Sequence, residues 1–155
     1  MNQRAGIGRL TRQLCRALFA EDTVNEYRLL YAPSRSSNLT ALPSHPNLSL
    51  RRLPLNERWQ TIAWHRLRLP LWADVAAGGV DVFHSPDFVL APVRHAKTVV
   101  TVHDLTFVAR PECAVPSLRR YLGRVVPRSV RRADRVLADS KATADDLMRL
   151  YGVPA

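Results

Sequence analysis

Three short polar pairs contain most of the side chains in this sequence that are suited to chemistry. They are His84-Ser85, His103-Asp104 and Asp139-Ser140, and each lies at the end of a short apolar run. An imidazole can donate a hydrogen bond, act as a base or bind a metal, whereas a hydroxyl before a helix can cap it or contact a phosphate. The alternative for each pair is a local structural role in a turn or a helix cap.

The pair His103-Asp104 follows the β-branched run TVVTV without an intervening loop. This position predicts a buried strand that ends on an imidazole and a carboxylate, either as a functional site or as a locally bonded strand end. A metal site of the His-Asp phosphohydrolase kind is disfavoured. Such sites place the pair on a helix and need further His and Asp ligands, while this pair ends a strand.

A second candidate is Gly6-Ile7-Gly8, followed by Arg9. Glycines permit a tight turn and close approach to backbone amides, and the start of a helix favours an anion. The segment predicts a turn that leads into a helix over residues 5–20, with a plain turn as the alternative. Thr11 stands where a dinucleotide-binding fingerprint has its third glycine, so that fingerprint is incomplete.

Hydrophobic periodicity predicts the elements that would position these residues. In the first predicted helix, an apolar stripe of Leu10, Leu14, Ala17 and Leu18 is expected to face the core. The expected strands cover 27–31, 48–53, 80–84, 98–102 and 135–138, and the expected helices cover 5–20, 57–77, 117–133 and 140–151.

Proline should kink or split the second helix at Pro70 and interrupt the third at Pro127. The Trp- and Arg-containing stretch 57–77 reads as a core stripe, with a membrane or partner surface as the alternative.

The alternation of strands and helices predicts an α/β fold, Rossmann-like and doubly wound, with a mainly parallel sheet. Ligands of such sheets bind beyond the carboxyl ends of the strands, so we expect the three polar pairs to converge there. A glycine turn that enters a helix normally follows a first strand, and MNQR cannot form a buried one. We therefore expect the first strand of the sheet to be missing.

The composition of the 155 residues limits the functional classes. The net charge is +10, and the basic residues are 21 Arg and two Lys spread along the chain. This distribution indicates either a solvated surface or an electrostatic field that attracts phosphates and anionic lipids. Cys15 and Cys113 lack partners at metal-ligand spacing, so we expect no metal and a cytoplasmic location. Neither a signal peptide nor an apolar run long enough to cross a bilayer is found in the sequence.

Four segments in order carry a specific resemblance: GIGRLTRQLCRAL, VDVFHSPDFVLAP, TVVTVHDLTF and RRYLGRVVPRSVRRADRVLADSKATADDLMRLYGVP. Together they resemble family-4 glycosyltransferases of the two-domain GT-B type, and more narrowly the bacterial mannosyltransferase-like members. The resemblance spans residues 6–154. It departs from the family at Leu10, where Tyr is more common, and at Lys141, where Glu is more common.

The resemblance implies that residues 1–155 are the acceptor-side, N-terminal domain of such an enzyme, without the C-terminal nucleotide-sugar domain, so that this chain alone is inactive. The implied reaction is retaining hexosyl transfer, mannose being one candidate, from a nucleotide sugar to a glycan or lipid-linked acceptor. No cofactor or metal is implied. A basic face would place the enzyme peripherally on the inner membrane leaflet.

Carried over by position, the resemblance makes His103 a histidine beside the transferred sugar and Asp104 a residue that orients its loop. The implied contacts to the donor phosphate or the acceptor come from the glycine loop, the arginine after it and two strand-end residues: Gly6, Gly8, Arg9, His84 and Ser140.

A second hypothesis, from the charge alone, is a basic module without catalytic activity that binds anionic membrane or nucleic acid. Nucleic acid is disfavoured, because the sequence has no RRM, KH or helix-turn-helix signature and its aromatic residues do not interleave with a basic stretch.

Overall fold

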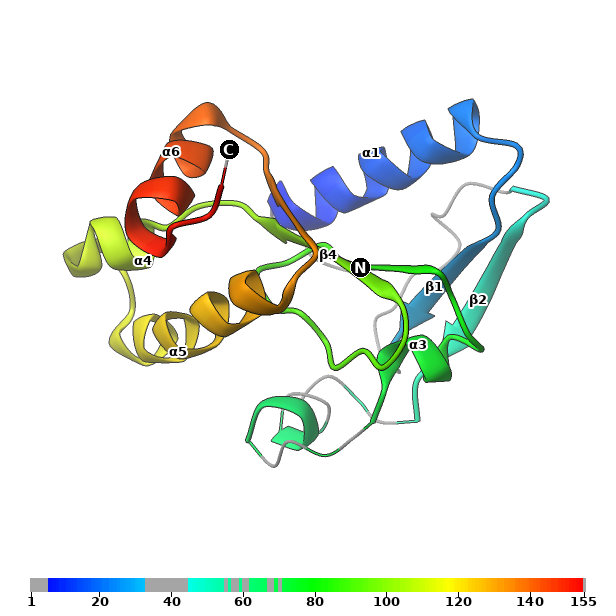
Figure 1. Cartoon of the computed structure of the whole chain (residues 1–155), viewed down its shortest axis with the longest axis horizontal. Helices are drawn as coiled ribbons and strands as arrows, with labels where there is room; N and C mark the ends of the chain where they lie inside the picture. The colour runs from blue at the N-terminus through cyan, green and yellow to red at the C-terminus, as the bar shows by residue number, and fades with distance from the viewer. Residues whose placement is uncertain are drawn as a thin grey trace. The chain divides into compact units, whose positions relative to one another are not determined.

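The fold is given by a computed structural model, which describes residues 6–32, 45–54, 56, 59, 62–66, 69 and 71–154 (Figure 1). The chain forms two compact units. The first comprises Met1–Leu71 with Val75–Gly79, and the second comprises Trp72–Asp74 with Val80–Ala155. The expectation of no strand before Ala5 falls on residues 1–5, which lie outside the described part.

The first unit contains helix α1 (Gly6–Glu21) and two parallel strands, β1 (Tyr27–Tyr31) and β2 (Leu48–Arg52). An Asp22 turn joins α1 to β1. Its carboxylate accepts hydrogen bonds from the amides of Val24 and Asn25 and from the Tyr27 hydroxyl at 2.6 Å. This last contact raises the pKa of Tyr27 to about 12. The turn thereby fixes where the helix ends and the first strand begins.

The buried face of α1 differs from the predicted stripe. Gly8, Cys15 and Phe19 are buried, whereas Leu10 and Leu18 are 39% and 41% exposed. Phe19 packs edge-on against Tyr27 of β1 at a centroid distance of 4.8 Å. The aromatic contact therefore sets the rotation of this helix, and the leucine spacing alone does not predict it.

The prediction of one long helix over 57–77 is wrong within the described residues. A π-helical turn, η2 (Ile62–Arg66), and a short helix, α3 (Ala73–Ala76), are separated by Leu69, Leu71 and Trp72 in non-helical conformation. Leu71 instead accepts a hydrogen bond from the Trp64 indole at 2.9 Å through its carbonyl. Pro70, the predicted kink, lies outside the described residues.

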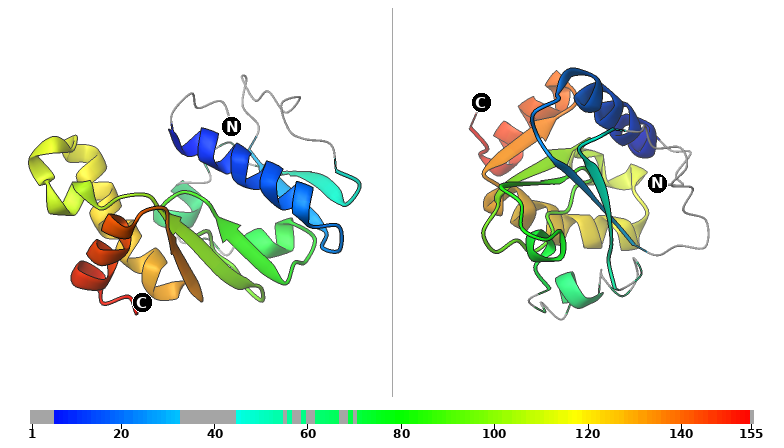
Figure 2. Two further views of the ribbon diagram at one scale, coloured as in Figure 1. Left: turned by 90° about the horizontal axis from the view of Figure 1, so that it is seen from above. Right: turned by 90° about the vertical axis from the view of Figure 1, so that its right-hand side faces the viewer.

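The second unit is built on a parallel sheet of β3 (Val82–Ser85), β4 (Lys97–Val102) and β5 (Arg135–Ala138), in that order (Figures 1 and 2). β4 is central, and most of it is buried, as expected for a β-branched run covered on both faces. All pairings between described strands are parallel, which confirms the predicted α/β, Rossmann-like class. The described strands form two separate sheets.

Four helical segments follow β4: α4 (Thr106–Ala109), the 3-10 turn η3 (Pro111–Cys113), α5 (Pro116–Arg132) and α6 (Lys141–Tyr151). The core of this unit joins Val102 and Leu105 at the end of β4 to Val126 of α5 and Leu147 of α6. Helix α6 ends at Gly152, whose φ of 67° is the left-handed conformation that glycine adopts most readily.

The predicted interruption at Pro127 is wrong, because α5 continues through this residue to Arg132. Val125, Val126, Ser129 and Val130 around the proline are all buried. Ser129 also accepts a hydrogen bond from the Leu90 amide at 2.9 Å, which ties the helix to the loop after β3. Tertiary packing on both sides of the proline offsets the backbone bond that it removes.

Two carboxylates fix the amino-terminal edge of this sheet. Asp134 accepts hydrogen bonds from the Thr98 amide at 2.9 Å and its hydroxyl at 2.8 Å, and from Lys97 at 2.9 Å. Asp74, only 2% exposed, accepts bonds from three successive amides, those of Arg94, His95 and Ala96. These contacts hold β4 at its start and leave its carboxyl end for other chemistry.

Candidate functional site

The site is centred on His103, which follows the last residue of β4. Its Nδ1 lies 2.9 Å from Oδ2 of Asp139, directly after β5, and its Nε2 lies 2.9 Å from the carbonyl oxygen of Pro86, directly after β3. The ring thus bridges the carboxyl ends of three adjacent strands. We call this group, His103, Pro86 and Asp139, the strand-end rim.

Both partners of the His103 ring are hydrogen-bond acceptors. A neutral imidazole has one N–H and satisfies one of them, whereas a doubly protonated ring satisfies both and gains a charge-assisted bond to Asp139. The side chain of His103 is only 10% exposed and that of Asp139 is 35% exposed, so the pair is partly shielded from water. A carbonyl oxygen can only accept, so this arrangement presents Nε2 of His103 as the donor to Pro86.

The backbone of His103 is fixed as well. Its carbonyl oxygen accepts a hydrogen bond at 2.8 Å from the Thr143 hydroxyl in the first turn of α6. The Thr143 amide in turn donates to the Ser140 hydroxyl at 3.1 Å. The predicted cap role of Ser140 is confirmed, and the cap connects α6 to the central residue of the rim.

A strained aromatic residue lies against the same ring. Phe88 has a φ of 46°, the only positive φ of a non-glycine residue within the described part of the chain. Its ring meets His103 edge-on at a centroid distance of 5.4 Å and meets Phe107 at 6.4 Å. A bulky side chain in this conformation costs about 1–3 kcal/mol, and such residues concentrate at functional sites. Sequence reasoning missed Phe88, because nothing in its type signals a positive φ.

Asp87, the neighbour of Phe88, adds charge near the rim. Desolvation raises the pKa of its carboxyl group, and the His103 charge acts in the opposite direction. Burial and then the charge of Asp87 raise the pKa of Tyr121 on α5, so this helix lies within electrostatic reach of the rim. The rim is therefore a mixed site, in which an imidazole lies near two carboxyl groups, those of Asp87 and Asp139.

The other predicted residues of this unit have local roles here. Asp104 accepts a hydrogen bond from the Thr106 amide at 2.9 Å, at the first residue of α4. His84 lies within β3, with its Nε2 2.8 Å from the Thr101 hydroxyl of β4. Burial lowers the pKa of His84, and a neutral imidazole offers no charge to a phosphate. Ser85 contacts the Ala91 amide at 3.3 Å.

The glycine motif belongs to the first unit. The prediction that this motif opens a helix over residues 5–20 is confirmed, since α1 begins at Gly6. Both glycines are themselves helical, with Gly8 buried in the first turn, and do not form a separate turn ahead of the helix. Arg9 is exposed on the next position of the helix. These residues and the strand-end rim thus belong to different units.

The predicted convergence of three strand ends is confirmed for two pairs, through His103 and Asp139. For the third, the Pro86 carbonyl contacts the ring in place of His84 and Ser85, which precede it. Knowledge of the strand order β3-β4-β5 would have identified these partners of His103. The residue pattern within a single strand does not reveal that order.

No cluster of three His, Cys, Asp or Glu side chains that could hold a metal occurs within the described residues. Of the helices described, none is long and apolar enough to cross a bilayer.

Comparison with known proteins gives two matches. A curated relative, the "O-antigen chain mannosyltransferase B" of Escherichia coli, is 27% identical over 166 residues, which cover 97% of this chain and 41% of the relative. The chain thus spans about two fifths of the length of that protein. No solved structure matches significantly. The sequence model of Glycosyltransferase Family 4 matches residues 4–155, nearly the whole chain. The chain therefore belongs to Glycosyltransferase Family 4.

Proposed function

We propose that this chain is the acceptor-side domain of a retaining glycosyltransferase. The enzyme would move a hexose, with mannose as the first candidate, from a nucleotide sugar to a glycan or a lipid-linked acceptor. The observation that carries the proposal is the position of His103 in a chain of this family. The ring lies at the end of the central parallel strand, where Asp139 and Pro86 contact its two nitrogens. The name of the E. coli relative supports mannose.

In the proposed reaction the bond from the sugar C1 to the leaving diphosphate breaks, and a bond from C1 to the acceptor oxygen forms on the same face. The acceptor proton passes to the departing diphosphate. An oxocarbenium-like transition state of this kind is stabilised by fixed dipoles and charges that are oriented before the reaction. The residues of the second unit would contribute such orientation at the rim.

His103 would act as a hydrogen-bond donor. A sugar hydroxyl or phosphate oxygen arriving at the rim would compete with the Pro86 carbonyl for the Nε2 proton, while Asp139 keeps the ring in place through Nδ1. No metal or organic cofactor is part of the proposal, and the nucleotide sugar would be bound mainly by a second domain. Gly6, Gly8 and Arg9 on α1 remain proposed contacts to the donor phosphate or the acceptor.

The test uses a chimera in which residues 4–155 replace the matching part of the E. coli relative. We expect the chimera to transfer mannose from nucleotide-activated mannose and the isolated 155-residue chain to transfer none. His103→Ala should lower the turnover of the chimera at least about ten-fold, within the range that one oriented polar group contributes.

Two matched variants sharpen this test. His95→Ala removes an exposed imidazole from a loop of the same unit and should leave turnover unchanged. His103→Gln retains an N–H donor and should keep more activity than His103→Ala. Equal inactivity of both His103 variants would indicate a base instead of a donor, and full activity of His103→Ala would remove this residue from the mechanism.

A further inference from the structure

The carboxylate of Asp87 differs from the other carboxylates around the strand-end rim, because it has no bonded partner. Asp104 accepts a hydrogen bond from the Thr106 amide, and Asp139 lies 2.9 Å from the His103 ring. Among the described residues, none donates a hydrogen bond to the side chain of Asp87. The residue is also exposed, so the acceptor positions of its carboxylate are open to a ligand.

The backbone on both sides of Asp87 is attached to the rim. The carbonyl oxygen of Pro86, the residue before it, lies 2.9 Å from Nε2 of His103. The amide of Phe88, the residue after it, donates to the Thr101 carbonyl of β4 at 2.9 Å, and the Phe88 ring meets the His103 ring at a centroid distance of 5.4 Å. Neighbouring Cα atoms are about 3.8 Å apart, so Asp87 has to lie beside the imidazole.

This position of Asp87 has a cost for the folded protein. Desolvation raises the pKa of its carboxyl group, and the His103 charge offsets only part of this effect. At neutral pH the ionised carboxylate is therefore less favourable in the folded chain than in the unfolded chain. The Val89 amide donates to the Asp87 carbonyl across Phe88, whose φ is 46°, in the rare and strained pattern of a γ-turn with positive φ. A charge that lowers stability without a bonded partner is typical of a functional position.

A pyranose with two neighbouring hydroxyl groups fits the groups found here. The two oxygens of the Asp87 carboxylate can accept from both hydroxyl groups at once, and Nε2 of His103 can donate to a hydroxyl oxygen. The half-buried ring of Phe88 offers apolar surface to the C–H face of a sugar. A carboxylate on the sugar itself, as in a uronic acid, would be repelled by the like charge of Asp87.

We propose that Asp87 is a specificity-determining residue, which binds a neutral acceptor sugar through two adjacent hydroxyl groups and excludes acidic sugars. This inference rests on the proposed function, since it assigns a contact within the acceptor site of the same reaction. The carboxylate would hold the acceptor sugar next to His103, which donates from the other side of the Pro86 carbonyl.

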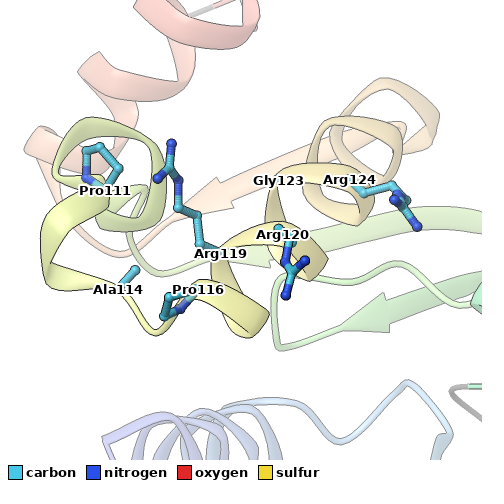
Figure 3. Close-up of a pocket in the computed structure, with 7 residues that line it drawn as sticks. All are labelled: Pro111, Ala114, Pro116, Arg119, Arg120, Gly123 and Arg124. Atoms are coloured by element: carbon cyan, nitrogen blue, oxygen red, sulfur yellow. The ribbon is translucent and has the colours of Figure 1, made fainter.

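A depression of about 660 Å³ on the same unit contains none of these residues and offers a different set of groups (Figure 3). Its lining combines Arg119, Arg120 and Arg124 with small and apolar residues such as Pro116 and Gly123. Guanidinium groups donate hydrogen bonds and cannot accept them. The hydroxyl groups of a neutral sugar need both kinds of partner, so the rim, where a donor adjoins an acceptor, fits such a sugar better than the depression does.

The first test measures binding of methyl α-mannopyranoside to the 155-residue chain by saturation-transfer NMR. Asp87→Ala should weaken binding at least about ten-fold, the loss expected for a hydrogen bond to a charged group. The same variant should raise the urea midpoint of unfolding, because it removes a desolvated charge; a residue with a merely structural role would lower this midpoint.

Two variants serve as matched controls for this binding test. Asp81→Asn removes an exposed carboxylate just before β3, and Arg120→Gln changes the depression. Both should bind the mannoside like the wild type. Unchanged binding in Asp87→Ala, or an equal loss in Asp81→Asn, would overturn the proposal.

The second test uses the chimera with a neutral mannoside and the corresponding uronic acid as acceptors. Asp87→Asn should raise the KM of the mannoside about ten-fold with little change in kcat, and it should reduce the preference for the mannoside over the uronic acid. A higher KM for the nucleotide sugar alone, or an unchanged preference between the acceptors, would overturn the proposal. Absence of transfer by the unmutated chimera would contradict the proposed function, and binding to the chain alone would then decide the role of Asp87.

Discussion

Two histidines on adjacent strands show how the surroundings of a residue decide its chemistry. His84 is half-buried, has Thr101 as its partner and has its pKa lowered by burial, which favours the neutral ring. His103 lies at the next strand end, where its Nδ1 faces a carboxylate and its Nε2 faces a carbonyl. The sequence presents both as an imidazole at the end of an apolar run. Their different roles follow from whether the ring packs against the sheet or lies at its edge.

The lowered pKa of His84 predicts a pH-dependent stability. As the pH falls below about 6.5, the unfolded chain takes up a proton on this residue more readily than the folded chain does, so the free energy of unfolding decreases. The penalty grows by about 1.4 kcal/mol for each unit by which the folded pKa is lowered. Urea unfolding at a series of pH values should show that His84→Gln loses this part of the slope. His95→Gln, in an exposed loop, should retain it, and an unchanged slope in His84→Gln would contradict the prediction.

At the scale of elements, α5 shows that packing decides where a helix ends. Pro127 removes one backbone hydrogen bond, and its ring approaches the carbonyl four residues earlier, that of Gly123. Buried residues before and after the proline hold both halves of the helix against the same core. The helix therefore continues with a local defect, where a sequence rule predicts an end.

Replacing this proline should stabilise the protein. Pro127→Ala restores a backbone donor in the interior of α5 and should raise the free energy of unfolding by about 1–3 kcal/mol, measured by urea denaturation. Pro116→Ala is the matched control, because proline is well accommodated at the first position of a helix and restricts the unfolded chain. This control should leave stability unchanged or slightly lower. A loss of stability in Pro127→Ala would mean that packing of the proline ring outweighs the missing bond.

Most of the strands were predictable as short, largely apolar runs, and β2 from its alternation of apolar and polar residues. The strand ends lie within two residues of the expected positions. The helical turns α4 and η3 were missed, since periodicity needs more residues than these segments contain. His103 was identified as a candidate from its place after β4. Its contacts to Asp139 and Pro86 needed the order of strands in the sheet, which local patterns do not specify.

At the scale of the whole molecule, the candidate residues are divided between two compact units. Gly6, Gly8 and Arg9 lie on α1 of the first unit, and His103 lies in the second. Each unit also contains one free cysteine, Cys15 in the first and Cys113 in the second. The thiols therefore offer a probe for the first unit, since Cys15 is 8% exposed and burial raises its pKa, while Cys113 is exposed.

A thiol reagent should label Cys113 at once and Cys15 only after the first unit opens. We expect at least about a 100-fold difference in rate under native conditions, which corresponds to an opening free energy near 3 kcal/mol. In the variant Cys113→Ser, labelling of Cys15 can be followed alone as urea is raised. Equal native rates for the two thiols would show that α1 does not hold its buried face against the rest of its unit.

The contacts of His103 have a consequence for the order in which the protein matures on the ribosome. Pro86 precedes the histidine by 17 residues, but Asp139 and Thr143 follow it by 36 and 40. A nascent chain that has reached Ala138 already contains every strand of the second sheet, yet its imidazole still lacks both later partners. The contacts of His103 are completed after the scaffold, by the five residues that follow β5.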